Sequence, residues 1–130
     1  MPLVAIFMYE GCGTDRMKLL TASPWEYTEV YTQYNSSRKE LVFQAGQVNN
    51  RLDLSNERVK FNEDGTVYDT AHNGHVYIGT WQFINNQTQY QTNINGAIST
   101  ANINTLNGDN FIWFDPDNSG GEYSTMIHIP

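Results

Sequence analysis

Residues 58–83 read RVKFNEDGTVYDTAHNGHVYIGTWQF and decide the fold. Asp64-Gly65 and Asn73-Gly74 each separate runs in which apolar and polar residues alternate. Asp-Gly and Asn-Gly are the dipeptides that tight β-hairpin turns prefer, because these turns need residues that tolerate a positive φ. The stretch therefore predicts three consecutive antiparallel strands.

The turn at Asn73-Gly74 sets the pairing of the second hairpin. With two residues in the turn, His72 lies opposite His75 and Tyr68 lies opposite Gly79. Side chains alternate between the two faces of a strand, so this register separates aromatic from aliphatic side chains. We expect the aromatic face to be interior, and its members are Phe61, Tyr68, Tyr77, Gly79, Trp81 and Phe83. The opposite face holds Val67, Val76, Ile78 and Ile84.

The first hairpin allows two registers. A two-residue turn at Asp64-Gly65 pairs Phe61 with Tyr68, whereas a three-residue loop over 63–65 pairs Phe61 with Val67. A shift of one residue moves the side chains of a whole strand to the opposite face. The loop length therefore decides which of the two neighbouring side chains, Val67 or Tyr68, faces the core.

Composition and charge favour one domain rich in β-strands. A chain of 130 residues is long enough for a single hydrophobic core without disulfides. Eight Tyr, six Phe and three Trp favour strands over helices. The net charge of −7 with only seven Lys and Arg argues against a nucleic-acid partner, because phosphate binding needs clustered basic residues. The single cysteine, Cys12, excludes an intramolecular disulfide.

Turn signals continue along the whole chain. They recur at Asn85-Asn86, Asn95-Gly96, Asn107-Gly108 and 115–121, about 9 to 12 residues apart, which is typical of an antiparallel sandwich or barrel. Upstream, the pattern predicts a helical turn over 16–20, strands over 25–34 and 40–47, and a covered loop over 48–56 with an optional short strand at 52–54.

These connections predict an all-β, antiparallel up-and-down meander of eight to nine strands, because short loops make sequence neighbours into sheet neighbours. Closing the meander into a barrel removes its two exposed edges. A barrel of about eight strands can enclose one small ligand. The alternative is an open sandwich with a filled core.

Five short motifs follow one another along the chain: Leu19-Leu20, Trp25, Asn49-Asn50-x-Leu52-x-Leu54-Ser55, Val59-x-Phe61-Asn62-x-Asp64-Gly65-Thr66 and Gly79-Thr80-Trp81-x-Phe83. Together they resemble the lipocalin-like domains of bacterial surface lipoproteins. The resemblance covers most of residues 19–130 and implies a calycin-type, lipocalin-like barrel that is exported and often lipid-anchored. It implies no activity, because small barrels host many functions.

Residues 1–18 form a separate N-terminal segment in this interpretation, and the barrel domain spans 19–130. Residues 2–9 are apolar but too short to cross a bilayer, which takes about 20 residues. They fit the remnant of a signal peptide, with Cys12 as the lipidated first residue of the mature lipoprotein. We therefore expect an exported protein, at the periplasm or cell surface, that meets the membrane only through Cys12. The alternative is an extra strand with a free thiol.

Aromatic side chains are the main candidates for function. Tyr and Trp that face a barrel interior offer apolar walls with a polar handle, which suits a small apolar or amphipathic ligand. The predicted ligand-binding residues are Tyr27, Tyr31, Phe61, Tyr68, Tyr77, Trp81 and Trp113. A void well under about 300 Å³ would instead favour a solid core. The protein would then be a structural or protein-interaction module whose Val76 and Ile78 meet a partner.

The sequence predicts no catalytic residues, no cofactor and no metal site. It lacks Gly-x-Ser-x-Gly, a phosphate-binding loop and His-Glu-x-x-His. His72 and His75 would need a further metal ligand such as Asp69 or His128. The loop over 115–122 carries alternate oxygen ligands as in a calcium loop, but Met126 occupies the twelfth position, where a Glu is required. An isomerase or hydrolase is the least favoured interpretation.

Overall fold

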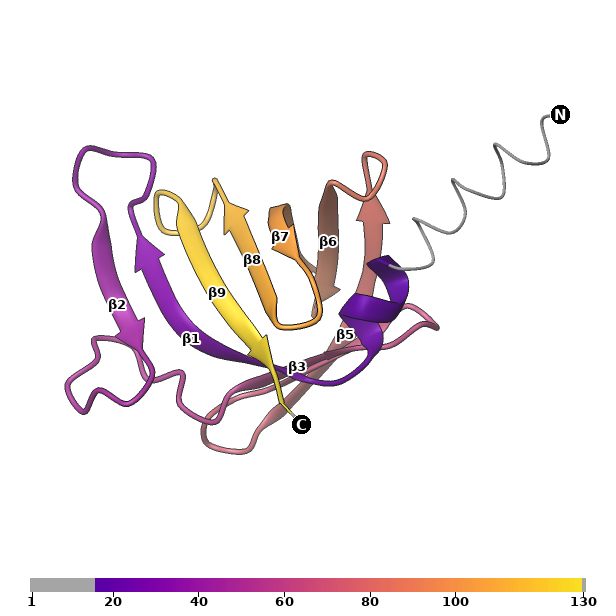
Figure 1. Ribbon diagram of the computed structural model, residues 1–130, viewed down its shortest axis with the longest axis horizontal. Coiled ribbons are helices and arrows are strands. Elements are labelled where there is room, and N and C mark those ends of the chain that lie inside the picture. The colour runs from indigo at the N-terminus through magenta and orange to yellow at the C-terminus, as the bar shows by residue number, and fades with distance from the viewer. Residues whose placement is uncertain (1–15, 130) are drawn as a thin grey trace, which may run out of the picture.

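Nine antiparallel strands form one sheet in the structure, a computed structural model that describes residues 16–129 (Figure 1). The strands are β1 (Trp25–Thr32), β2 (Glu40–Gln44), β3 (Arg58–Phe61), β4 (Thr66–Thr70), β5 (Val76–Ile84), β6 (Gln89–Ile94), β7 (Ala97–Leu106), β8 (Asn110–Asp115) and β9 (Glu122–His128). A helical turn over 16–21 precedes them. The predicted all-β meander of eight to nine strands is confirmed.

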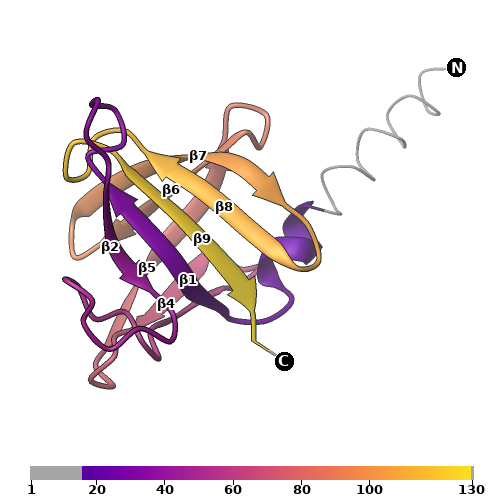
Figure 2. The ribbon, with the colours of Figure 1, turned by 60° about the vertical axis from the view of Figure 1, so that its left-hand side comes forward.

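The sheet closes on itself. Its order is β2-β1-β3-β4-β5-β6-β7-β8-β9, and β1 also pairs with β9. Eight strands, β1 and β3 to β9, thus form a barrel, and β2 lies beside β1 as an additional strand (Figure 2). The contact between β1 and β3 is short, with Trp25 opposite Val59 and Glu26 opposite Arg58. Closure excludes the open sandwich.

The β3–β4 hairpin adopts the three-residue loop. Asn62 N donates to Thr66 O at 2.9 Å, and Gly65 has a φ of 91°. Phe61 consequently pairs with Val67. Asp64 Oδ1 supports the loop by accepting hydrogen bonds from the backbone N and the hydroxyl of Thr66, at 2.9 and 2.7 Å. The two-residue register of this hairpin is therefore excluded.

The β4–β5 hairpin also has a three-residue loop, so its predicted two-residue turn is wrong. Ala71 N donates to His75 O at 2.8 Å, and Gly74 has a φ of 91°. A turn of this kind needs only one residue at positive φ, which Gly supplies. Tyr68 therefore pairs with Ile78 rather than Gly79. Both loops place Val67 inside the barrel, where it is 1% exposed, and Tyr68 outside, where it is 42% exposed.

One end of the barrel is closed by the helical turn. Leu20 is fully buried in the main core cluster. The indole Nε1 of Trp25 donates to Leu20 O at 3.0 Å, and Lys60 Nζ donates to Thr21 O at 2.8 Å. Arg16 adds a hydrogen bond to Gln87 O, in the β5–β6 turn, at 2.7 Å. We call this the helix end of the barrel.

A second, smaller core cluster lies between β1 and β2. Val30, Val42 and Phe43 are buried there, and Leu54 packs against them. The rest of the loop over 48–56 is largely exposed, with Val48 91% exposed, so its predicted burial is wrong. The optional strand at 52–54 does not form.

Residues 1–15, with Cys12, lie outside the described part of the chain, so the predicted lipidation site has no structural account. Within residues 16–129, no helix has the length and hydrophobicity needed to cross a membrane.

Candidate functional site

A cavity of about 190 Å³ lies inside the barrel, toward the end opposite the helical turn. Its position follows from the strand termini that line it: Ile94 ends β6, Asp115 ends β8 and Glu122 begins β9. In an up-and-down barrel these termini lie at one end, with the turns over 95–96 and 116–121. We call this the cavity end.

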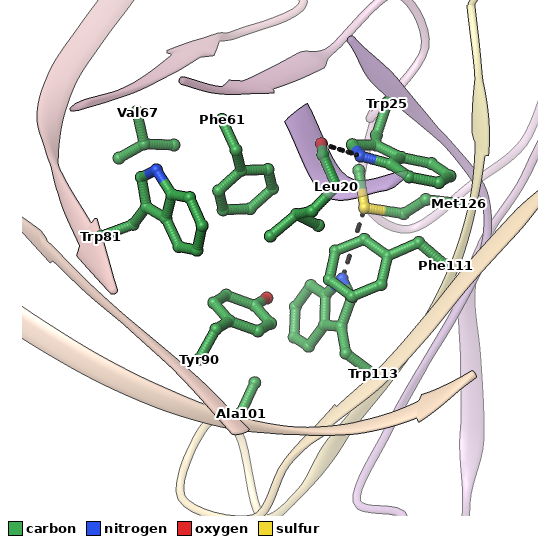
Figure 3. Packing of buried hydrophobic residues seen from close by; sticks show 10 residues of the cluster. All are labelled: Leu20, Trp25, Phe61, Val67, Trp81, Tyr90, Ala101, Phe111, Trp113 and Met126. Carbon is green, nitrogen blue, oxygen red and sulfur yellow. Dashed lines mark hydrogen bonds between the residues drawn. The ribbon is translucent and has the colours of Figure 1, made fainter. Parts of the chain in front are cut away.

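Aromatic rings make the apolar part of the cavity. Phe61 and Phe111 meet edge to face with centroids 6.1 Å apart, and Tyr90 meets Trp113 in the same way at 6.1 Å. The indole Nε1 of Trp113 donates to the sulfur of Met126 at 3.3 Å (Figure 3). These contacts fill the middle of the barrel and restrict the open space to its cavity end.

Three carboxyl groups make the polar part. Asp69, Asp115 and Glu122 all line the cavity, together with the amide of Asn118. Each carboxyl is placed by strand alternation: Asp69 follows Val67, Asp115 follows Trp113, and Glu122 precedes Met126 on the inward face. The sheet geometry therefore directs acidic side chains into the barrel.

These carboxyl groups have few partners. Asp115 is 6% exposed, and its Oδ1 accepts the backbone N–H of Asp117 at 2.9 Å. The carboxyl of Asp69 is hydrogen-bonded to Glu57, but its Oδ1 and the hydroxyl of Ser124 are buried without a partner. Both ion pairs within residues 16–129 belong to Glu40. No basic side chain in that range neutralises the carboxyls of the cavity.

Burial and mutual repulsion shift the pKa values of this acidic group. Burial, a hydrogen bond with Asp69 and the charges of Asp69 and Glu122 raise the pKa of Glu57, which lies just before β3, to about 8. Burial also raises the pKa of Asp69, and a hydrogen bond with Glu57 partly opposes this shift. For Glu122, burial raises the pKa, Asn118 opposes the shift through a hydrogen bond, and the charge of Asp115 adds to it. A negative charge is thus unfavourable here without a cation.

Two tyrosine hydroxyls belong to the same region. Tyr27 and Tyr90 line the cavity, and burial raises the pKa of both phenols well above its ordinary value. Tyr90 is only 6% exposed, yet its hydroxyl makes no hydrogen bond within the described chain. Figure 3 shows this oxygen pointing toward the centre of the aromatic cluster. A hydroxyl on the cavity wall without a protein partner is available to a ligand.

Five of the seven predicted ligand-binding residues lie on the inward face, but only three reach the cavity. Tyr27, Phe61 and Trp113 line it. Trp81 is buried in the core, where its Nε1 donates to Asn62 O at 2.8 Å. Tyr77 is half-exposed beyond the cavity and packs on His75, with ring centroids 4.4 Å apart. These last two positions contribute to packing rather than to the lining.

The predicted interior positions of Tyr31 and Tyr68 are wrong. Tyr68 faces outward because the β3–β4 and β4–β5 loops have three residues. Tyr31 faces outward because β1 has a bulge between Tyr27 and Glu29, which reverses the alternation beyond it. Tyr31 packs on Tyr34, with ring centroids 6.2 Å apart, on the outer surface.

Sequence reasoning did not identify Asp115, Glu122, Glu57 or Tyr90, and it named Asp69 only as a possible metal ligand. Charged residues on strands usually lie on the solvated face. Alternation supplies a usable signal for one of them: if Trp113 faces inward, Asp115 must do so too. No comparable signal identifies Glu57, which lies outside any strand.

The histidines do not assemble a metal site. His72 lies within the β4–β5 loop and does not oppose His75. His128 is at the helix end, stacked on Trp25 with ring centroids 3.5 Å apart and hydrogen-bonded through Nδ1 to Ser23 Oγ at 2.7 Å. No group of three His, Cys, Asp or Glu side chains in residues 16–129 could hold a metal ion.

Comparisons with known proteins identify the fold. No protein-family model matches the chain, and no curated protein matches its sequence. Among solved structures, a DUF4847 family protein from Bacteroides vulgatus has a TM-score of 0.58 at 13% identity, over 86% of this chain and 96% of that one. A lipocalin-like protein from Bacteroides uniformis has a TM-score of 0.53 at 11% identity, over 85% of this chain and 99% of that one. The fold is therefore a lipocalin-like barrel, as the sequence resemblance implied.

Proposed function

We propose that this lipocalin-like barrel binds a small, partly apolar molecule in its cavity and acts by binding rather than by catalysis. The cavity lining carries the proposal, because it combines aromatic rings with the side chain of Tyr90, whose hydroxyl takes part in no hydrogen bond among the described residues. A bound molecule with a matching polar group would form a hydrogen bond with this hydroxyl. The aromatic rings beside it would cover the apolar part of the molecule.

The cavity limits the size of the ligand. Its volume of about 190 Å³ is smaller than the roughly 300 Å³ at which ordinary ligand sites begin, so the expected cavity of ordinary ligand size is absent from the described barrel and only a smaller ligand is compatible with it. Fatty acids and other long lipids are therefore poor candidates. A molecule with one ring or a short chain fits better, and it would gain about 25 cal/mol for each Å² of apolar surface that it buries.

Native mass spectrometry of the protein purified under gentle conditions tests this proposal. We expect a co-purifying small molecule that is lost from the variant Ala101→Leu, since Ala101 is buried and lines the cavity. The matched control is Ala97→Leu, at an exposed position of the same strand. Retention of the molecule by Ala101→Leu with native stability would contradict binding in the cavity.

We also propose that the protein is a bacterial lipoprotein, exported and anchored through a lipid on Cys12. The apolar run over 2–9 followed by Gly11 and Cys12 supports this proposal. Mass spectrometry of the N-terminal peptide from a native host should show a diacylglyceryl group on Cys12 and no residues before it. An intact Met1 or an unmodified Cys12 would end the proposal.

A protein-interaction module is the second candidate function. Ile78 and Ile98 are 58% and 63% exposed on the outer face, and the small cavity also fits a scaffold role. Crosslinking in the host separates the two candidates. A specific crosslinked partner that is lost from Ile78→Lys but kept by Ala101→Leu would favour the interaction module over ligand binding.

A further inference from the structure

We infer that the cavity selects a small organic cation, an alkylammonium or arylalkylammonium ion whose charged head lies among Asp69, Asp115 and Glu122. The inference rests on the proposed function, because it names the chemistry of the molecule that the cavity would hold.

The charge of the cavity is the first reason. Three of its lining residues are acidic and none is basic. Like charges held close together away from water repel one another and lose hydration. A single positive charge placed among them would relieve both effects, whereas a carboxylate or phosphate ligand would add to the repulsion.

Basic side chains around the cavity end either contact other groups or are exposed to solvent. Arg38 and Arg51 both pair with Glu40, and Arg51 and Glu40 line a separate groove that Glu122 also borders. Lys39 lies over the ring of Tyr34, with Nζ 5.0 Å from the centroid. The remaining ones near this end, Arg58, His72 and His75, are exposed. The described chain therefore supplies no internal cation for the three carboxyls.

Unpaired polar atoms provide an independent second reason. Tyr90 lines the cavity with a side chain that is more than nine-tenths buried, and its hydroxyl takes part in no hydrogen bond among the described residues. Oδ1 of Asp69 is buried without a partner, although the Asp69 carboxyl is hydrogen-bonded to Glu57. An ammonium group has up to three N–H donors, all of which need acceptors. The carboxyl and phenol groups that line the cavity provide such acceptors.

The aromatic lining is the third reason. Trp113, Tyr27 and Tyr90 line the same cavity as the acidic residues, with Tyr27 and Trp113 ring centroids 6.5 Å apart. Faces of Trp and Tyr attract organic cations, and the attraction grows when water is excluded. Phe61 and Phe111 lie deeper and would contact the hydrocarbon part of the ligand. Rings beside carboxylates thus suit an amine better than a hydrated metal ion.

Isothermal titration calorimetry with three ligands of the same shape tests the inference. Phenethylamine is a cation at pH 7.5, 2-phenylethanol is neutral, and phenylacetate is an anion. We expect the amine to bind at least about tenfold more tightly than the alcohol, a difference of about 1.4 kcal/mol, and phenylacetate to show no binding. If the alcohol binds as tightly as the amine, the inference fails while the proposed function stands. If none of the three binds at millimolar concentration, both fail.

Neutral variants locate the charge recognition. Asp69→Asn and Glu122→Gln should each reduce the preference for the amine over the alcohol by at least about threefold while keeping the affinity for the alcohol. The matched control is Glu63→Gln, which removes the same charge from an exposed position in the β3–β4 loop at the helix end. Unchanged preference in both cavity variants, with alcohol binding intact, would overturn the inference.

Discussion

The two ends of the barrel satisfy their buried polar groups very differently. At the helix end, the indole N–H groups of Trp25 and Trp81 donate to backbone carbonyls at 3.0 and 2.8 Å. Lys60 Nζ there donates to Thr21 O, Phe61 O and Asn62 Oδ1. At the cavity end, Oδ1 of Asp69 has no partner and carboxyl groups face one another. The same strands run through both ends, so the fold does not impose this difference.

The contrast indicates that one end of the barrel mainly stabilises the fold and that the other end is suited to binding. Satisfied hydrogen bonds and dense packing make the helix end the stabilising part of the molecule. Unpaired groups and raised pKa values at the cavity end lower stability, as is common where a protein binds something. Changes at the helix end should therefore destabilise, whereas neutralising changes at the cavity end should stabilise.

Trp25→Ala should have the largest effect. Trp25 is fully buried and contacts Phe111, with ring centroids 5.3 Å apart. Loss of the ring should lower the free energy of unfolding by about 3 to 5 kcal/mol, measured by urea denaturation. Trp25→Phe, which keeps a ring but loses the hydrogen bond to Leu20 O, should lose less. Equal losses for the two variants would mean that packing contributes little.

Stability should fall as pH rises from about 5 to 8. The folded-state pKa of Glu57 is about 8, above its ordinary value of 4.5, so the folded state binds more protons than the unfolded state between these values. Asp69 and Glu122, which face it, shift in the same direction. Because Glu57 is partly exposed, the change should be only on the order of 1 to 2 kcal/mol.

Urea denaturation across this pH range measures the effect. Glu57→Gln should reduce the change of the free energy of unfolding with pH, whereas Glu63→Gln should leave this change as it is in the unmodified protein. A protein that becomes more stable between pH 5 and 8 would contradict the placement of these carboxyls.

Glu122→Gln should stabilise the protein without ligand at pH 8. The substitution removes a charge that burial and Asp115 make unfavourable. We expect a gain on the order of 0.5 to 1 kcal/mol, seen as a higher melting temperature. Destabilisation of the same size would show that the Glu122 carboxylate makes a stabilising contact, and that the two ends are more alike than their contacts indicate.

Tyr90→Phe should have the smallest effect. Removing a hydroxyl that is hydrogen-bonded typically costs about 1 kcal/mol, but the hydroxyl of Tyr90, on the cavity wall, takes part in no hydrogen bond among the described residues. The free energy of unfolding should therefore change by less than about 0.5 kcal/mol. A loss of a full kcal/mol in the ligand-free protein would mean that this hydroxyl is paired in solution, for example by an ordered water.

Local signals in the sequence were enough to predict the strands, the meander and the closed barrel. Asn-Gly and Asp-Gly mark turns regardless of what surrounds them, so the order of β3 to β9 followed directly, whereas the pairing of β3 with β1 rather than with β2 did not. Loop length is not encoded so clearly: one additional residue in each hairpin loop exchanged Val67 and Tyr68 between the two faces. The bulge after Tyr27 had the same effect on Tyr31.

The candidate site was only partly predictable. Phe61, Tyr27 and Trp113 follow the expected alternation, and they line the cavity. Cavity volume depends on how side chains pack across the barrel, which no local pattern records. Charged side chains usually face water, and the acidic groups of the cavity are exceptions to this preference. Sequence patterns identify such exceptions poorly.

Closure of the barrel through β1 and β9 has a consequence for how the chain folds. Ser23 and His128, which are hydrogen-bonded at this seam, lie 105 positions apart in the chain. Contacts so distant in sequence form late and slowly, because a long loop must be ordered first. During synthesis, β1 must wait with one edge unpaired until β9 has left the ribosome. A chaperone that shields this edge would thus act on the nascent chain for nearly the whole time of its translation.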